Sequence, residues 1–93
     1  MAEPSFEWDD AKDRVNQTKH GVSFVTAQRA FLDPHRVIVP DLGHSHREVR
    51  HFCFGFVEGG VMTVRFTWRE GHIRIIGAGY WRMGKDVYEH ENR

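Results

Sequence analysis

The sequence lacks the features that mark secreted, membrane-spanning or nucleic-acid-coating proteins. It has one cysteine in 93 residues, so it can form no internal disulfide and offers no paired spacing for a zinc or redox site. No apolar run approaches the roughly 18 to 20 residues of a transmembrane helix. Thirteen basic and thirteen acidic residues give a formal net charge of zero, which argues against binding nucleic acid by bulk electrostatics. We therefore expect a soluble cytoplasmic protein with no membrane partner, in which any nucleic-acid site is a local cluster.

The length and the order of elements predict one small α+β domain over residues 1–93. Helix signals come first: Asp9 and Asp10 can start a helix at 10–19 that ends at Gly21, and Ser23 can cap a second helix. From there the apolar period changes to two, with tight glycine turns between the segments. The remaining predicted elements are a strand at 6–8, an edge strand at 37–40, strands at 50–56, 62–68 and 72–78, and a helix at about 81–91. The expected fold has two N-terminal helices and a C-terminal helix packed on a mainly antiparallel sheet.

The alternation along the strands predicts one apolar and one polar face. We expect Phe52, Phe54 and Phe56 to lie under the helices, together with the apolar residues of the next strand, Met62, Val64, Phe66 and Trp68. Arg65, Thr67 and Arg74 then project from the opposite face, where burial does not explain them.

The cationic residues of this region are the strongest functional signal. They form the set Arg65, Arg69 and Arg74, followed by Tyr80, Trp81, Arg82 and Lys85. Arginine holds phosphate in bidentate fashion and aromatic rings stack on unpaired bases, so this combination favours single-stranded RNA. Two plainer interpretations remain open: a solvated strand face paired with nearby acids such as Glu70, and an aromatic pair that only anchors the last helix.

Histidine and cysteine suggest weaker alternatives. His44, His46 and His51 are potential metal ligands, but three histidines without a carboxylate at a firm spacing are more often surface residues. Cys53 is a potential nucleophile, although on a strand it is more often small core filler. We expect no metal and no cofactor.

A series of short motifs runs in a fixed order along nearly the whole chain. They are Phe6-Glu7-Trp8-Asp9, Lys19-His20-Gly21-Val22-Ser23-Phe24, Ala30-Phe31-Leu32-Asp33-Pro34, Arg47-Glu48-Val49-Arg50, Phe66-Thr67-Trp68-Arg69, Ile73-Arg74-Ile75-Ile76 and Tyr88-Glu89. In this order and spacing the sequence resembles the BrnT toxins, within the wider group of RelE-like toxins. It departs from them at 77–85, where many members have Ser-Ala-Arg and a strongly basic helix, and where this chain has an aromatic pair in place of some positive charge.

The resemblance implies a RelE-like fold and a metal-free ribonuclease toxin that inhibits translation and growth. It also implies a BrnA-type antitoxin partner, which dimerises the complex and binds operator DNA, so that the toxin meets DNA only through the antitoxin.

On this basis we predict attack of the RNA 2′-hydroxyl on the adjacent phosphorus, which leaves a 2′,3′-cyclic phosphate. The candidates are Arg65 and Arg74 for charge stabilisation, with Arg50 and Arg69 as alternatives; Lys19, His20 and Glu48 for proton transfer; and Thr67, Arg69, Tyr80, Trp81 and Arg82 for binding RNA. Imidazole titrates near neutrality, which favours His20, although a histidine there also suits a helix C-terminus. The rival hypotheses are a non-catalytic protein-interaction module and a metal-dependent nuclease.

Overall fold

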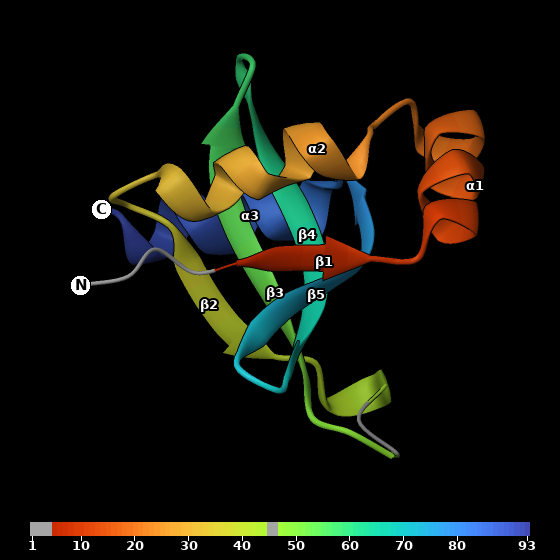
Figure 1. Cartoon of the computed structure of the whole chain (residues 1–93). Coiled ribbons are helices and arrows are strands. Elements are labelled where there is room, and N and C mark those ends of the chain that lie inside the picture. The colour runs from red at the N-terminus through yellow and green to blue at the C-terminus, as the bar shows by residue number, and fades with distance from the viewer. Residues whose placement is uncertain (1–4, 45–46) are drawn as a thin grey trace.

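The computed structural model describes residues 5–44 and 47–93, which form a three-layer α+β arrangement around one sheet (Figure 1). In chain order the elements are β1 (Phe6–Trp8), α1 (Asp10–His20), α2 (Phe24–Ala27), the 3-10 helix η1 (Gln28–Leu32), β2 (Val37–Pro40), the 3-10 helix η2 (Leu42–His44), β3 (Arg50–Val57), β4 (Gly60–Arg69), β5 (His72–Gly79) and α3 (Arg82–Glu91). The predicted fold class is confirmed.

The sheet has the strand order β1-β5-β4-β3-β2. All neighbouring pairs are antiparallel except β1 and β5, which run parallel, so the first strand of the chain closes the edge beside the last. β2, which ends at Pro40, lies at the other edge, as a strand that ends in proline predicts. In Figure 1, α2 and η1 cross one face of the sheet and α3 lies behind it on the other.

The helix ends form where the sequence predicts them. The Asp9 side chain accepts a hydrogen bond from the backbone N–H of Lys12 at 3.1 Å, and Gly21 ends α1 with a left-handed φ of 69°. Ser23 caps α2 through the backbone N–H of Thr26 at 3.1 Å. The second helix is less regular than expected, because its α-helical turn tightens into the 3-10 helix η1.

Both hairpin turns have two central residues with positive φ. Glu58 and Gly59 have φ values of 51° and 89°, and Glu70 and Gly71 have values of 51° and 81°. This combination is that of a type I′ turn, whose twist matches the twist of the flanking strands. The predicted β3-β4-β5 meander is thereby confirmed, with Gly60 already paired in β4.

The predicted distribution of side chains between the two faces is wrong for the phenylalanines. Phe52 lies opposite Arg65 and Phe54 opposite Thr63, and directly opposed residues project from the same face of a sheet. The phenylalanines of β3 therefore share the arginine face, which we call the α3 face. Cys53 projects with its partner Val64 from the other face, toward α2 and η1.

The close approach of η1 explains this reversal. A Cβ on Gly55 would lie 2.2 Å from the carbonyl oxygen of Ala30, so only glycine lets η1 pack on β3 at this point. The main core lies between η1, α2 and the sheet, and it contains Phe24, Ala27, Ala30, Phe31, Cys53, Val57, Met62, Val64, Phe66, Ile73, Ile75 and Ala78.

The α3 face is only partly covered. Phe54 and Thr63 are buried where α3 passes over them, and a Cβ on Gly84 would lie 2.1 Å from the Thr63 hydroxyl oxygen. Toward β5 the register shifts by one residue, because Arg65 pairs with Gly77 and the next residue of β4 pairs with Ile75. This bulge leaves Ile76 unpaired beside the uncovered part of the face.

Candidate active site

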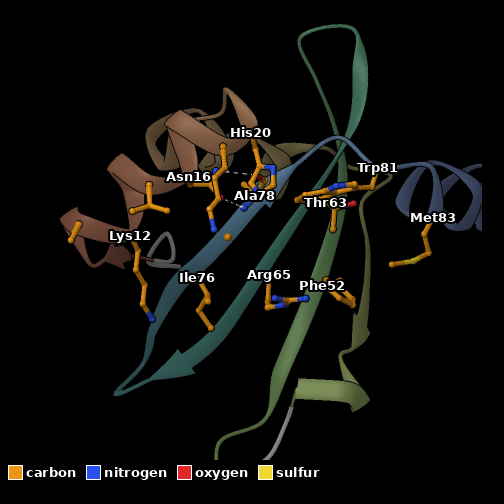
Figure 2. Close-up of a pocket in the computed structure, with 14 residues that line it drawn as sticks. Lys12, Asn16, His20, Phe52, Thr63, Arg65, Ile76, Ala78, Trp81 and Met83 are labelled. Atoms are coloured by element: carbon orange, nitrogen blue, oxygen red, sulfur yellow. Dashed lines mark hydrogen bonds between the residues drawn. The ribbon is translucent and has the colours of Figure 1, made fainter.

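A groove of about 550 Å³ opens on the uncovered part of the α3 face, between α1 and the start of α3 (Figure 2). Its floor is formed by β3, β4 and β5. The lining residues are Ala11, Lys12, Val15, Asn16, Lys19 and His20 of α1, Phe52, Thr63, Arg65, Ile76, Gly77 and Ala78 of the sheet, and Trp81 and Met83 at the start of α3.

The ionisable side chains that line the described part of the groove are all basic. Of the described residues that line it, Lys12, Lys19, His20 and Arg65 are basic and none is acidic. The chain as a whole has zero formal net charge. This local excess of positive charge in a hollow suits an anionic ligand.

Arg65 lies on the floor of the groove and is held from two sides. Its Nε lies 2.9 Å from the Asp41 carboxylate, and its guanidinium carbon lies 5.3 Å from the centre of the Phe52 ring. The Arg65 side chain is 32% exposed, whereas Asp41 is only 5% exposed. The arginine is thus anchored at a fixed place while part of it stays open to the groove.

The other predicted arginines lie on the same face, in the next row of the sheet. Arg50 pairs with Thr67 in β3 and β4, and Thr67 pairs with Arg74 in β5, so the three lie side by side across the strands. Arg74 forms an ion pair with Glu7 at 3.2 Å. Neither Arg50 nor Arg74 lines the groove. Both lie in the row of side chains next to the row that contains Arg65.

Glu48 and Arg69 lie at the far end of this face. The Glu48 carboxylate lies 3.0 Å from Arg69 and 3.8 Å from Arg50. Thr67 is buried, and its hydroxyl donates to the carbonyl of Val49 at 2.8 Å. The threonine therefore ties the strand to the preceding loop, and its hydroxyl is already engaged.

Lys19 and His20 reach the groove from the last turn of α1. Both are exposed and both line it. The His20 ring contacts Trp81 edge-on, with centroids 5.0 Å apart. His20 thus lies at the helix C-terminus and in the groove at once, so its two predicted roles are compatible.

The aromatic pair at the start of α3 divides between two sites. Trp81 lines the groove. Tyr80 does not line it, and its hydroxyl donates to the carbonyl of Val57, at the end of β3, at 2.9 Å. Arg82 is exposed at the first residue of α3 and does not line the groove.

The sequence did not predict two of the groove residues, Asn16 and Lys12, or the partner of Arg65. Asn16 is buried, donates to the carbonyls of Val22 and Ala78, and so fastens α1 to β5. Lys12 lies one turn before Asn16 on the same helix face, a spacing that could have revealed it. Asp41 gives no such signal, because its pairing with Arg65 depends on the path of the loop.

The structure does not favour the two alternative kinds of site, a cysteine nucleophile and a histidine metal site. Cys53 is fully buried in the main core, and this burial raises the pKa of its thiol to about 12, which disfavours the reactive thiolate. Among residues 5–44 and 47–93, no three histidine, cysteine or acidic side chains gather as a metal site would require. His46 lies outside the described residues, and so does the side chain of His44.

Comparison with known proteins decides the family. The family model for the BrnT ribonuclease toxin of type II toxin–antitoxin systems matches residues 8–83. The chain belongs to the BrnT family. The resemblance found in the sequence motifs is thereby confirmed, and BrnT membership makes the chain a ribonuclease toxin whose system includes an antitoxin partner.

A solved BrnT structure shares the fold. The 1.1 Å crystal structure of the Brucella abortus ribonuclease toxin BrnT superposes with a TM-score of 0.68 at 21% identity, covering 85% of this chain and 97% of that one. A search of curated proteins gave no match. In the part of the chain that the structure describes, no helix has the length and apolar character needed to cross a membrane.

Proposed function

We propose that this BrnT-family chain is a metal-independent endoribonuclease that binds RNA in the groove of the α3 face. The observation that carries the proposal is the charge of that groove: four basic residues and, among its described lining residues, no acidic one, in a chain of zero net charge. Phosphodiesters are the anions that a ribonuclease must hold, and guanidinium and ammonium groups are their usual protein partners.

The proposed reaction is an internal transfer at phosphorus. The 2′-oxygen attacks the adjacent phosphorus while a base removes its proton, and the bond to the 5′-oxygen breaks as that oxygen gains a proton. The products are a 2′,3′-cyclic phosphate and a free 5′-hydroxyl, and no oxidant or water is consumed. The enzyme must therefore supply a proton acceptor, a proton donor and positive charge for the phosphorane.

Arg65 is the proposed source of that positive charge. It lies on the groove floor, and its ion pair with Asp41 fixes the guanidinium before the substrate arrives, which is what electrostatic stabilisation of a transition state needs. Arg74 and Arg50, in the next row, are proposed to bind the neighbouring phosphates of the strand. Arg69 lies beyond them, paired with Glu48.

His20 is the proposed proton carrier, with Lys19 beside it. Both lie on the α1 wall of the groove that has Arg65 on its floor, and imidazole exchanges protons near neutral pH. Glu48 is less suitable than the sequence suggested, because its carboxylate already faces Arg50 and Arg69.

The biological consequences follow the family. We propose that cleavage of cytoplasmic RNA inhibits translation and growth. A BrnA-type antitoxin is the proposed neutralising partner, which dimerises the complex and contacts operator DNA on its behalf.

The test is cleavage of labelled single-stranded RNA by the purified protein in excess EDTA, free or bound to ribosomes. We expect cleavage with cyclic phosphate ends by the wild type and a loss of at least about 100-fold in Arg65→Ala, the size typical when a charge-stabilising group is removed. Arg29→Ala is the matched control, because Arg29 is an exposed arginine paired with Glu58 outside the groove. Equal activity in the two variants, or activity that requires added metal, would overturn the proposal.

A non-catalytic interaction module predicts a different result. Growth arrest by the wild type and by Arg65→Ala alike, without cleavage on or off the ribosome, would favour that hypothesis.

A further inference from the structure

We infer that the groove is a pocket for one unpaired base, so that the substrate is RNA whose target nucleotide is unstacked and single-stranded. This inference rests on the proposed ribonuclease function and adds the class of nucleotide that the site accepts. It depends on the placement of Trp81, on the apolar walls around it and on the position of the cations.

Trp81 has the geometry of a stacking platform. A Cβ on Gly79 would lie 2.5 to 2.8 Å from three atoms of the six-membered indole ring, so the ring packs directly against the backbone of Gly79. Trp81 is nevertheless 43% exposed. The backbone of Gly79 thus supports the indole ring, the His20 ring lies roughly perpendicular to it, and the exposed part of the ring is open for another flat ring.

The walls around Trp81 are apolar but unfilled. Val15 and Met83 are about half exposed although they are hydrophobic, and Phe52 and Ile76 are only partly buried. The groove volume of about 550 Å³ lies within the roughly 300 to 1,000 Å³ typical of pockets for small organic ligands. A nucleobase that entered the groove would bury these apolar surfaces.

The cations lie where the backbone of such a nucleotide would run. Figure 2 shows Lys12 on the α1 wall and Arg65 on the floor, with Trp81 across the groove from Lys12. A base against the indole therefore leaves its phosphates to the basic residues, which matches apolar groups to the base and charged groups to the backbone.

A base that remains paired cannot use this site. In an A-form duplex both ring faces are stacked on neighbours, and side chains reach the bases only from their edges. Entry into the groove requires an unstacked base, which loops, bulges and free ends supply at little cost.

The experiment measures binding to a short single-stranded 2′-O-methyl RNA, which keeps its bases and phosphates but cannot undergo attack by the 2′-hydroxyl. We expect Trp81→Ala to weaken binding roughly 5- to 150-fold, the range for loss of one base–aromatic stack, and Trp81→Phe to retain most of it. Trp68→Ala is the matched control, because Trp68 is 55% exposed and lies outside the groove.

Gly79→Ala provides an independent variant. It substitutes none of the side chains that line the groove, but the added methyl must displace the Trp81 ring, so we expect a loss of binding close to that of Trp81→Ala. Circular dichroism spectra and unfolding midpoints of each variant identify any that fail to fold.

Two further probes separate base from phosphate recognition. An abasic oligonucleotide with the same backbone should bind more weakly to the wild type and be indifferent to Trp81→Ala. The same sequence held in a duplex should bind as weakly as the abasic strand.

The two proposals fail in different ways. If Arg65→Ala abolishes cleavage while Trp81→Ala and Gly79→Ala bind the single strand like the wild type, the base pocket is wrong and the ribonuclease proposal stands. Equal binding of the duplex and the single strand also overturns the base pocket. If Trp81→Ala weakens binding but Arg65→Ala cleaves normally, the proposed catalytic role of Arg65 is wrong and the pocket stands.

Discussion

The Asn16 side chain pairs with the peptide unit of Ala78 in both directions. Its Nδ2 donates to the Ala78 carbonyl at 2.9 Å, and its Oδ1 accepts from the Ala78 N–H at 3.2 Å. The same Nδ2 also donates to the carbonyl of Val22. Because α1 is otherwise mostly exposed, this one amide sets the position of the groove wall against β5.

Asn16→Ala should therefore affect both stability and the groove. The change leaves buried backbone groups at Ala78 and Val22 without their partner, so we expect a loss of about 2 to 3 kcal/mol in the free energy of unfolding. Urea denaturation measures it. Asn92→Ala, which removes an exposed amide, should change stability by less than about 0.5 kcal/mol. Equal effects of the two substitutions would show that Asn16 is not a structural link.

Gly84→Ala should destabilise the protein, although alanine is the better helix former. The added Cβ would lie 2.1 Å from the Thr63 hydroxyl oxygen and 2.9 Å from a Phe54 ring carbon, so α3 must shift from the sheet. We expect overpacking to cost about 1 to 3 kcal/mol net. Thermal unfolding tests this, with Gly43→Ala as control, because a Cβ there meets only Asp41 at 3.8 Å. A raised melting temperature in Gly84→Ala would contradict the described packing of α3.

Asp41→Asn should separate binding from catalysis. It removes the negative charge that holds Arg65 and keeps the size of the side chain. We expect kcat to fall about 10-fold or more, because the guanidinium loses its fixed position, while KM stays equal or falls, since the groove becomes more positive. Steady-state cleavage assays give both constants. A rise in KM with unchanged kcat would show that Asp41 does not position Arg65 for catalysis.

The Asp33–Tyr88 pair should limit stability at both extremes of pH. Partial burial raises the pKa of Asp33, but hydrogen bonds from the Tyr88 hydroxyl and from the backbone N–H groups of Phe56 and His35 outweigh it, so this pKa lies below its ordinary value of 3.8. The hydrogen bond to Asp33, followed by burial, raises the pKa of Tyr88 from 10.0 to about 12.

The signs of these shifts fix the direction of the effect. A lowered carboxyl pKa gives stability that is present above about pH 4 and is lost as the pH falls through the folded value. A raised tyrosine pKa gives stability that is present below pH 10 and is lost as the pH rises toward 12. Tyr88→Phe should therefore reduce stability at pH 7 and flatten its fall on both sides, which urea midpoints at pH 3, 7 and 10.5 would measure. A variant profile parallel to the wild type would count against this pair.

The sequence was sufficient where short-range chemistry decides the structure. The caps at Asp9 and Ser23, the glycine end of α1 and the glycine turns at Gly59 and Gly71 lie where predicted, because each depends on residues within one turn.

It was insufficient where both sides of a strand are apolar. In β3, Phe52 and Phe54 alternate with Cys53 and Gly55, and the larger side chains suggested the helix-covered core. Which face of β3 packs on the main core depends on Gly55, because its lack of a side chain lets η1 approach. This contact is with a segment 25 residues away, so it leaves no pattern in the sequence of the strand itself.

The candidate site could be predicted only in part, because residue type is visible in the sequence and the path of the chain is not. Arg65, Lys19, His20 and Trp81 are all groove residues, and the residue types alone suggested them. The separation of Trp81 from Tyr80, and the pairing of Asp41 with Arg65, depend on how the chain leaves β5 and enters β3, which alternation does not encode.

The groove is built from residues near both ends of the chain, so it forms late in the synthesis of the protein. Its α1 wall is synthesised early, but Ile76, Gly77 and Trp81 belong to the last quarter, and β1 finds its partner only when β5 emerges. A nascent chain that stops before β5 therefore has neither a closed sheet edge nor a groove. The site is complete only when translation of the chain is nearly finished, so a truncated copy that ends before β5 lacks the groove altogether.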